Sequence, residues 1–191
     1  MCIDPASTDR RIYGIMNARA VYARASCMRG DFMEWRKMRR FKQQVSEEDC
    51  IHILKTERRG VLALHGENGY PYAMPINFYY DEADGNIYFH GAKEGTKAEL
   101  LEADPRVSFC VCNQGFIREG EWAYNATSVI VRGRISIVED REKAERICRS
   151  LGLKYYPTPE GVEKELRMAF ARTRVTCLQI DYMTGKLVNE S

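Results

Sequence analysis

The sequence predicts a mainly β domain with flanking helices, built as a small barrel of six mostly antiparallel strands. Three observations lead to this fold class. Apolar residues recur at alternate positions in several short segments, as in strands with one buried face. Asn, Asp and Gly cluster between these segments, which is typical of hairpin turns. Strands and helices do not alternate regularly, so a Rossmann-type parallel sheet is not expected.

Residues 1–37 form an extension ahead of this domain, because regular patterning begins only near Met38. The first 42 residues carry a net charge of +6, which leaves −4 on the remainder. The extension is interpreted as a flexible or partner-binding arm, an Arg-rich organellar presequence, or sequence upstream of a start at Met33 or Met38. Because two acids interrupt its first ten residues, we favour the arm or the later start and assign the domain to residues 38–191.

A short helix opens the domain. Ser46 stands at the N-cap position, and Asp49 stands at the reciprocal position of a capping box. The helix is expected to run to about Lys55 and to end before Gly60.

Two hairpins are expected next. Residues 60–65 read as a buried strand, and the Asn-Gly pair within residues 67–69 predicts a hairpin turn. The return strand runs from 70 to about 80. The acidic turn at 81–85 leads into a third strand at 86–90.

The middle of the chain combines a helix with the longest strand. The helix covers residues 95–103, ends at an Asp-Pro pair, and is followed by a fourth strand at 106–112. A polar loop at 113–122 precedes a strand at 127–138. Gly133 interrupts the alternation of this strand, which predicts a bulge or bend.

The chain closes with two helices and a strand. The helices are expected at about 141–151 and 160–171, with two prolines between them. Residues 173–182 supply the sixth strand. Hairpin-linked strands with helices at the edges favour the small barrel.

Seven cysteines are scattered through the chain, an odd number that argues against a disulfide scaffold and favours reduced thiols in the cytoplasm. Cys110 and Cys112 would share one face of a strand. No second Cys or His pair lies at ligand spacing, so core packing is favoured for both and no metal site is expected.

Charge and hydropathy bear on several classes of partner. No apolar run is long enough to span a membrane, and none at the N-terminus suggests secretion. The mildly acidic domain lacks the basic face that nucleic-acid binding needs, although the basic extension alone could serve.

Residues 90–97, His-Gly-Ala-Lys-Glu-Gly-Thr-Lys, are the segment most suggestive of a cofactor. They leave a strand, pass two glycines and open a helix. Glycine permits close approach of a ligand to the backbone, and a helix N-terminus with added Lys and Thr favours an anion such as phosphate. An ordinary strand-to-helix turn with solvated lysines would show the same pattern, so both interpretations stay open.

Seven short segments carry a resemblance to a known family. They are Met38-Arg39-Arg40, Gly60 to Ala63, Gly69 to Pro75, Ile87 to Lys93, Val107 to Val111, Ser128 to Arg134 and Met183 to Lys186. In their order and spacing, which cover residues 38–188, they resemble the nitroimidazole-resistance (Nim)-like branch of the pyridoxamine 5'-phosphate oxidase-like proteins. That resemblance implies an FMN-binding split β-barrel of the six-stranded antiparallel Greek-key type.

The resemblance also implies a homodimer with two flavin sites, each at the subunit interface. One group of residues would lie along the isoalloxazine edge or present backbone to it: Met74, Pro75, Ile76, Asn77, Phe89, His90 and Gly91. Lys97 would meet the phosphate, with Thr96 assisting through its hydroxyl and Lys93 as a second cation. A further group would approach the flavin or the substrate from the long strand: Tyr124, Thr127 and Ser128.

The function implied is an FMN-dependent oxidoreductase that reduces a nitroimidazole-like or other small aromatic acceptor, with NAD(P)H as a candidate electron donor. One departure from the family's sequence pattern bears on this implied activity. Many Nim-like sequences have Gly-His-Lys where this chain has Gly95-Thr96-Lys97, so a His often found beside the flavin is absent. His90 is then the nearest imidazole and the candidate catalytic residue; an ordinary half-buried strand histidine is the equal alternative.

Two other functions stay open. Split barrels also serve as non-enzymatic flavin- or haem-binding modules, so FAD or haem could replace FMN. A pyridoxamine-phosphate-oxidase-like enzyme is favoured least, because Met74 and Thr96 stand where the oxidases carry phosphate-binding arginines.

Overall fold

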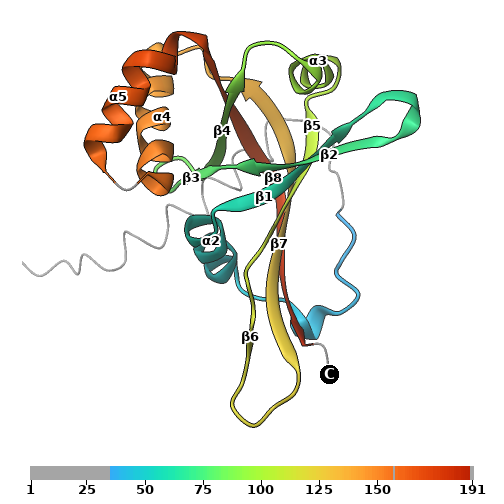
Figure 1. Ribbon diagram of the computed structural model, residues 1–191. Helices are drawn as coiled ribbons and strands as arrows, with labels where there is room; N and C mark the ends of the chain where they lie inside the picture. Colours follow the sequence, from blue (N-terminus) through green and yellow to red (C-terminus); the bar gives the residue numbers. More distant parts are fainter. Residues whose placement is uncertain (1–34, 157, 190–191) are drawn as a thin grey trace, which may run out of the picture. The chain divides into compact units, whose positions relative to one another are not determined.

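One antiparallel sheet organises the protein, with the strands in the order β2-β1-β5-β7-β8-β4-β3 and β6 beside β7 (Figure 1). The computed structural model describes residues 35–156 and 158–189, so nearly all of the expected extension at 1–37 lies outside the described residues. The strands are β1 (Arg59–His65), β2 (Pro71–Asn77), β3 (Tyr79–Asp81), β4 (Asn86–Ala92), β5 (Arg106–Cys112), β6 (Phe116–Ile117), β7 (Tyr124–Ile137) and β8 (Thr173–Asn189).

The described residues thus contain eight strands, and the expected number of six is wrong. The expected second strand at 70–80 is interrupted at Phe78, which separates β2 from β3. The Phe78 amide donates to the Tyr155 hydroxyl at 2.9 Å, and that hydroxyl lies 3.0 Å from the Phe78 carbonyl, so a side chain takes the place of a strand partner. The short β6 lies in the segment expected to be a loop.

The helices follow the predicted positions. They are α2 (Glu47–Thr56), α3 (Thr96–Ala103), α4 (Arg141–Tyr155) and α5 (Pro159–Ala169), with short 3-10 turns η1 (Phe41–Gln43), η2 (Glu67–Gly69) and η3 (Phe170–Arg172). The capping box is confirmed, because the Asp49 amide donates to Ser46 Oγ and the Ser46 amide donates to Asp49 Oδ2, each at 3.1 Å. α4 continues four residues past the expected end.

Two predicted irregularities of the sheet are present. Asn68 and Gly69 have φ values of 54° and 79°, as the expected Asn-Gly turn requires. The register of β7 against β8 shifts between Arg132 and Gly133, which confirms the bulge. A Cβ at residue 133 would collide with the Gln179 carbonyl oxygen, so the close approach of the two strands requires glycine.

Aromatic side chains fill the inner face of the curved sheet. Phe109 is fully buried and meets Phe78 and Phe89 edge-on, with ring centroids 4.9 and 5.2 Å away. Tyr88, on the opposite face of β4 from Phe89, packs instead with Ile147 of α4. The α4–α5 pair therefore covers the outer face of the sheet near β3 and β4 (Figure 1).

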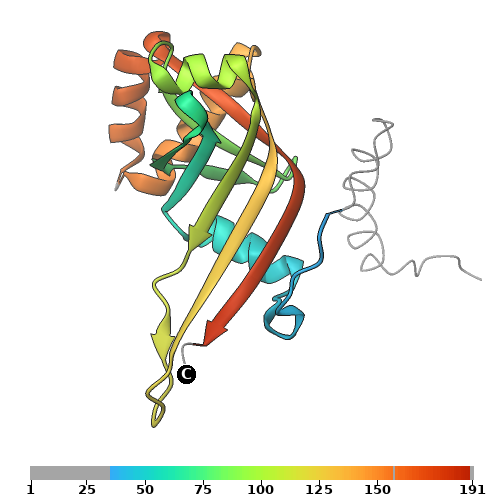
Figure 2. The ribbon, with the colours of Figure 1, turned by 90° about the vertical axis from the view of Figure 1, so that its right-hand side faces the viewer.

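β7 and β8 run side by side well beyond the body of the sheet, and the β6–β7 hairpin projects at their end (Figure 2). The expected sixth strand at 173–182 continues to Asn189. Its last residues include Thr184, Gly185 and Lys186, which show no apolar alternation. Pairing with β7 keeps them extended, and a single-strand pattern does not reveal such pairing.

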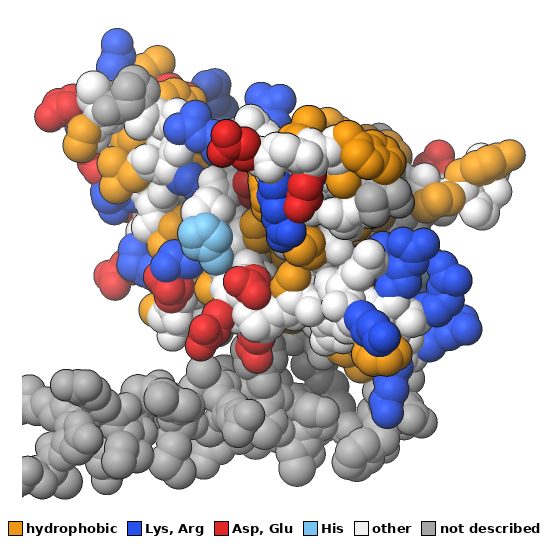
Figure 3. Space-filling view, turned by 90° about the horizontal axis from the view of Figure 1, so that it is seen from below, with side chains coloured by type: hydrophobic (Ala, Val, Ile, Leu, Met, Phe, Trp, Pro, Cys, Tyr) orange, Lys and Arg blue, Asp and Glu red, His pale blue; other side chains and the backbone are white. Residues whose placement is uncertain are grey.

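Charged residues are unevenly distributed near α2. Lys37, Arg39, Arg40 and Lys42 are exposed just before it, whereas its first turn carries three acids. Seen from below, Lys and Arg gather in one area of the surface and Asp and Glu in another (Figure 3).

None of the helices in the described residues is long and apolar enough to cross a membrane.

Candidate functional site

The end of β4 is the centre of the candidate site. Strand alternation places Phe89 in the core, 1% exposed, and His90 on the opposite face, where it is exposed. After Gly91 and Ala92 the chain leaves the sheet and enters α3 at Gly95. Gly95 has a φ of 106°, a conformation that favours glycine, and no described side chain caps the helix amides that follow it.

Lys97, in the first turn of α3, returns its side chain to the end of β4. Its amine lies against Gly91, since a Cβ added at residue 91 would collide with Lys97 Nζ. Burial lowers the pKa of Lys97. Among the described residues, no hydrogen bond or ion pair engages its ammonium group. A half-buried cation beside uncapped helix amides is chemically suited to an anion.

A cavity of about 210 Å³ adjoins this lysine. We name it the α3 cavity; it lies between α3 and the ends of β4, β7 and β8, and its polar lining includes Lys97, Glu102, Ser136, Arg174 and Thr176. Arg174 pairs with Glu102 at 3.3 Å. Within the described part of the chain, Lys97 is therefore the cation of this cavity that has no counter-ion.

A second cavity of about 210 Å³ lies on the other face of β4, under the α4–α5 pair. We name it the α4–α5 cavity; it is lined by Asn77, His90 and Thr173 from the sheet, by Cys148, Leu151, Gly152, Tyr155 and Tyr156, and by Val162, Glu165, Leu166, Ala169 and Phe170. It brings together Asn77 and His90, which the sequence assigned to the flavin edge from two separate strands.

His90 is electrostatically linked to the first cavity. Its pKa is lowered, mainly because neighbouring atoms displace water and secondarily because of the positive charge of Lys97. The lowered pKa favours the neutral imidazole, which can both donate and accept a hydrogen bond.

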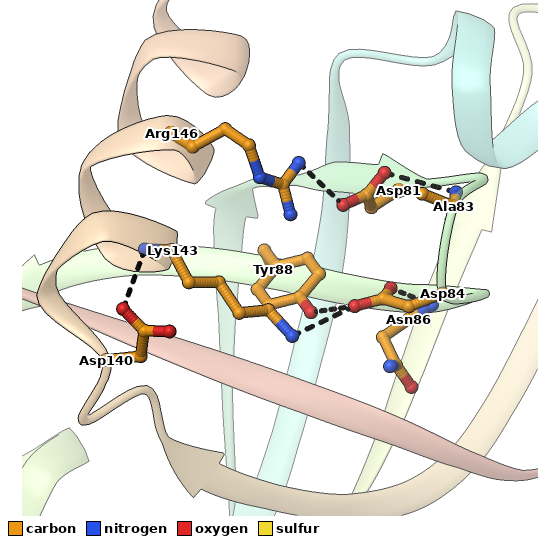
Figure 4. Close-up of polar contacts among 8 residues, drawn as sticks. All are labelled: Asp81, Ala83, Asp84, Asn86, Tyr88, Asp140, Lys143 and Arg146. Carbon is orange, nitrogen blue, oxygen red and sulfur yellow. Dashed lines mark hydrogen bonds and ion pairs between the residues drawn. The ribbon is translucent and has the colours of Figure 1, made fainter.

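A cluster of polar residues joins α4 to the β3–β4 turn through ion pairs (Figure 4). α4 forms one wall of the α4–α5 cavity. Arg146 pairs with Asp81 at 2.9 Å, and Lys143 pairs with Asp84 at 3.1 Å. Tyr88 donates to Asp84 as well. Burial acts to raise the pKa of Asp84, but the hydrogen bonds from Tyr88 and Lys143 outweigh it and leave the pKa lowered.

The remaining residues assigned to the isoalloxazine lie on an edge strand. β2 pairs only with β1 in the described sheet, and Met74, Ile76 and Asn77 are half-buried while Pro75 is exposed. β2 also approaches β4 without pairing to it. This unpaired junction is the split of the barrel.

Lys93 and Thr96 do not join Lys97. The Lys93 amine donates a hydrogen bond to the Ala171 carbonyl at 2.7 Å. Lys93 lines a different cavity, which lies beside α4. Thr96 is exposed as the first residue of α3.

Tyr124, Thr127 and Ser128 lie far from Lys97 within one chain. Ser136 of β7 lines the α3 cavity, and Ser128 stands eight residues before it, about 26 Å away along an extended strand. The predicted site residues therefore form two groups in one subunit.

Sequence reasoning missed Arg174, Tyr155 and Glu165. None lies in a motif, and only the packing of β8, α4 and α5 brings them to the cavities. Core packing was expected for Cys110 and Cys112; Cys110 is half-buried, but Cys112 is exposed at the end of β5.

The family model described as pyridoxamine 5'-phosphate oxidase matches residues 46–187. None of the curated proteins matches the chain significantly. Several solved structures do match the chain. A candidate 5-nitroimidazole antibiotic resistance protein from Bacteroides thetaiotaomicron is 20% identical, with a TM-score of 0.62 over 76% of this chain and 87% of that one.

Two mycobacterial structures are similar as well. The conserved hypothetical protein Rv2991 from Mycobacterium tuberculosis is 21% identical, with a TM-score of 0.65 over 79% of this chain and 90% of that one. The FAD-binding protein from Mycobacterium smegmatis is 22% identical, with a TM-score of 0.56 over 78% and 99%. These likenesses confirm the split-barrel fold, and the family match covers most of the chain. The chain therefore belongs to the pyridoxamine 5'-phosphate oxidase family.

Proposed function

We propose that this protein is a flavin-dependent oxidoreductase that binds FMN in a homodimer and reduces a small aromatic acceptor. The observation that carries the proposal is the half-buried Lys97 ammonium, which has no partner among the described residues and lies beside the uncapped N-terminus of α3. A flavin phosphate would supply the missing negative charge and accept hydrogen bonds from the amine and the helix amides.

Other residues suit the flavin ring. Backbone groups at the split between β2 and β4 can hydrogen-bond to a planar heterocycle there, and Gly91 adds no side chain that would obstruct it. The bound flavin would supply the two-electron chemistry, while the protein positions it. The neutral His90 imidazole can donate a hydrogen bond to an acceptor oxygen.

A second copy of the chain would complete the site. The outer face of the sheet carries a cross-strand row, Pro75, Val61, Cys110, Ile130 and Thr184, that spans five strands. Val61 and Ile130 are 44% and 40% exposed, so this row presents apolar area to solvent in one chain. Pairing two copies through this face would cover the row and could bring Tyr124, Thr127 and Ser128 of one chain toward Lys97 of the other.

The described cysteines support a cytoplasmic site of action, because all five are free thiols.

FAD remains the second candidate cofactor, since similar structures include FAD-binding proteins. One of them also binds haem, which makes haem a further candidate.

The visible spectrum of the purified protein tests the proposal, with the released cofactor identified by mass. FMN with its two visible bands, bleached by NAD(P)H and restored by a nitroaromatic acceptor, is the expected result. A Soret band would instead indicate a haem module. A colourless protein that takes up no added flavin would overturn the proposal.

A further inference from the structure

The α4–α5 cavity has fixed walls. α4 is fastened to the β3–β4 turn through Arg146 and Lys143, as described above. α4 and α5 approach closely at Gly152, where a Cβ would stand 2.7 Å from Val162 Cγ1. The space is therefore held open by the packing of three elements, as a preformed binding site requires.

Its size and lining suit one aromatic ring. An apolar cavity of about 150 Å³ can hold benzene, and this one measures about 210 Å³. Tyr155, Tyr156 and Phe170 supply aromatic surface, and Leu151, Val162 and Leu166 supply aliphatic surface. A ring with one small substituent fits this volume.

The charge of the lining is one-sided. Among the described residues that line the cavity, Glu165 is the only acid, His90 is neutral, and there is no Lys or Arg. Among the described residues, no hydrogen bond or ion pair engages the Glu165 carboxylate. Asn77 and Thr173 add uncharged hydrogen-bonding groups. A phosphorylated ring would find no positive partner here, whereas a ring with N–H donors or a positive charge would find a carboxylate.

We propose that the α4–α5 cavity binds the aromatic acceptor and selects neutral or cationic single rings bearing N–H donors over anionic ones. The inference rests on the proposed function, because His90 and Asn77 join the cavity to the residues assigned to the flavin. Glu165 sets the charge preference from the rim, and the aromatic walls hold the ring.

Three probes of nearly equal shape test the selection: benzamidine, benzamide and benzoate, which are cationic, neutral and anionic. Titration calorimetry with the full-length, FMN-loaded protein is expected to give a dissociation constant for benzamidine at least tenfold below that for benzoate. Glu165→Gln should bring benzamidine to the level of benzamide and leave benzamide unchanged. Glu160→Gln makes the same charge change on the same helix outside the cavity and should alter nothing.

A plugging variant tests the location. Ala169→Phe fills the cavity and should abolish binding of all three probes, whereas Met168→Phe changes an exposed neighbour and should not. Equal affinities for the three probes, or no effect of Glu165→Gln, would overturn the inference.

The same titration separates this inference from the proposed function. Flavin uptake without benzamidine binding would overturn the cavity assignment and leave the flavoprotein proposal intact. Benzamidine binding to a protein that takes up no flavin, lost in Ala169→Phe, would support the cavity as a binding site and overturn its role as an acceptor site.

Discussion

The Lys97 amine lies against the backbone of Gly91, in space that only a glycine leaves open. An alanine at residue 91 would displace the amine from this position while leaving the strand intact. We expect Gly91→Ala to weaken FMN binding about three- to tenfold, as measured by fluorescence titration. If the effect acts through the amine, Gly91→Ala should cost little further affinity in a Lys97→Ala background.

Removal of the Lys97 side chain should weaken FMN binding more than Gly91→Ala does. A charge-assisted hydrogen bond contributes about 1.5–3 kcal/mol, so Lys97→Ala is expected to raise the FMN dissociation constant about 10- to 100-fold. Lys164→Ala removes an exposed lysine of α5 and serves as the control. Equal dissociation constants for the two variants would rule out the phosphate assignment.

Dimerisation can be tested on the outer face of the sheet. Ile130→Lys places a charge in the exposed cross-strand row and should give a monomer in sedimentation velocity, with flavin lost although Lys97 is intact. Leu153→Lys charges another half-exposed apolar residue, on α4, and should leave the dimer unchanged. A monomeric wild-type protein that retains flavin would contradict the interface site.

The Asp81–Arg146 pair should stabilise the attachment of α4. Asp81 has a side chain 6% exposed, so Arg146→Met would leave a buried carboxylate without its counter-ion. We expect a loss of about 3 kcal/mol in the free energy of unfolding by urea, the lower end for a buried pair because the guanidinium is half-exposed. Arg149→Met, which removes a cation paired with two half-exposed acids, should cost less than about 1 kcal/mol.

In the Arg146→Met background, Asp81→Asn should recover part of the lost stability, because it removes the unpaired charge. Additive losses from the two substitutions would show that the pair does not act as a unit.

The lowered pKa of Lys154 predicts that the free energy of unfolding rises with pH. Burial lowers its pKa to about 8, although its ammonium donates to the Leu54 carbonyl at 3.2 Å and lies 4.0 Å from the Phe78 ring centroid. The unfolded chain, in which this lysine titrates near 10.5, then binds more protons above pH 7 than the folded protein does. The lysine should therefore add about 1 kcal/mol to the free energy of unfolding between pH 7 and 8.5.

Urea unfolding at those two pH values measures the increment. Lys154→Met should remove most of it, whereas Lys55→Met, which changes an exposed lysine of α2, should retain it. An increment that persists in Lys154→Met would assign the titration to another group.

The sequence by itself determined most of the elements. Local signals are strong where a backbone requirement selects a residue type: the Ser46–Asp49 capping box, the positive φ of Asn68 and Gly69, and the bulge at Gly133 were each predicted and are present. The expected membership of the pyridoxamine 5'-phosphate oxidase-like proteins is likewise confirmed by the family match, and the similar structures share the fold.

Tertiary structure decided what depends on contacts between distant residues. The break at Phe78 exists because the Tyr155 hydroxyl, supplied by α4, bonds to its backbone, and no signal near Phe78 encodes that partner. The extension of β8 to Asn189 depends in the same way on pairing with β7.

The candidate site shows the same division. Residues 90–97 indicated an anion site because glycines, a lysine and a helix start are adjacent in the chain. Glu165, Tyr155 and Arg174 carry no local pattern, and they reach the cavities only through the packing of α4, α5 and β8. Motifs report short-range backbone geometry, whereas a cavity wall is assembled from side chains far apart in sequence, so only the folded chain could place it.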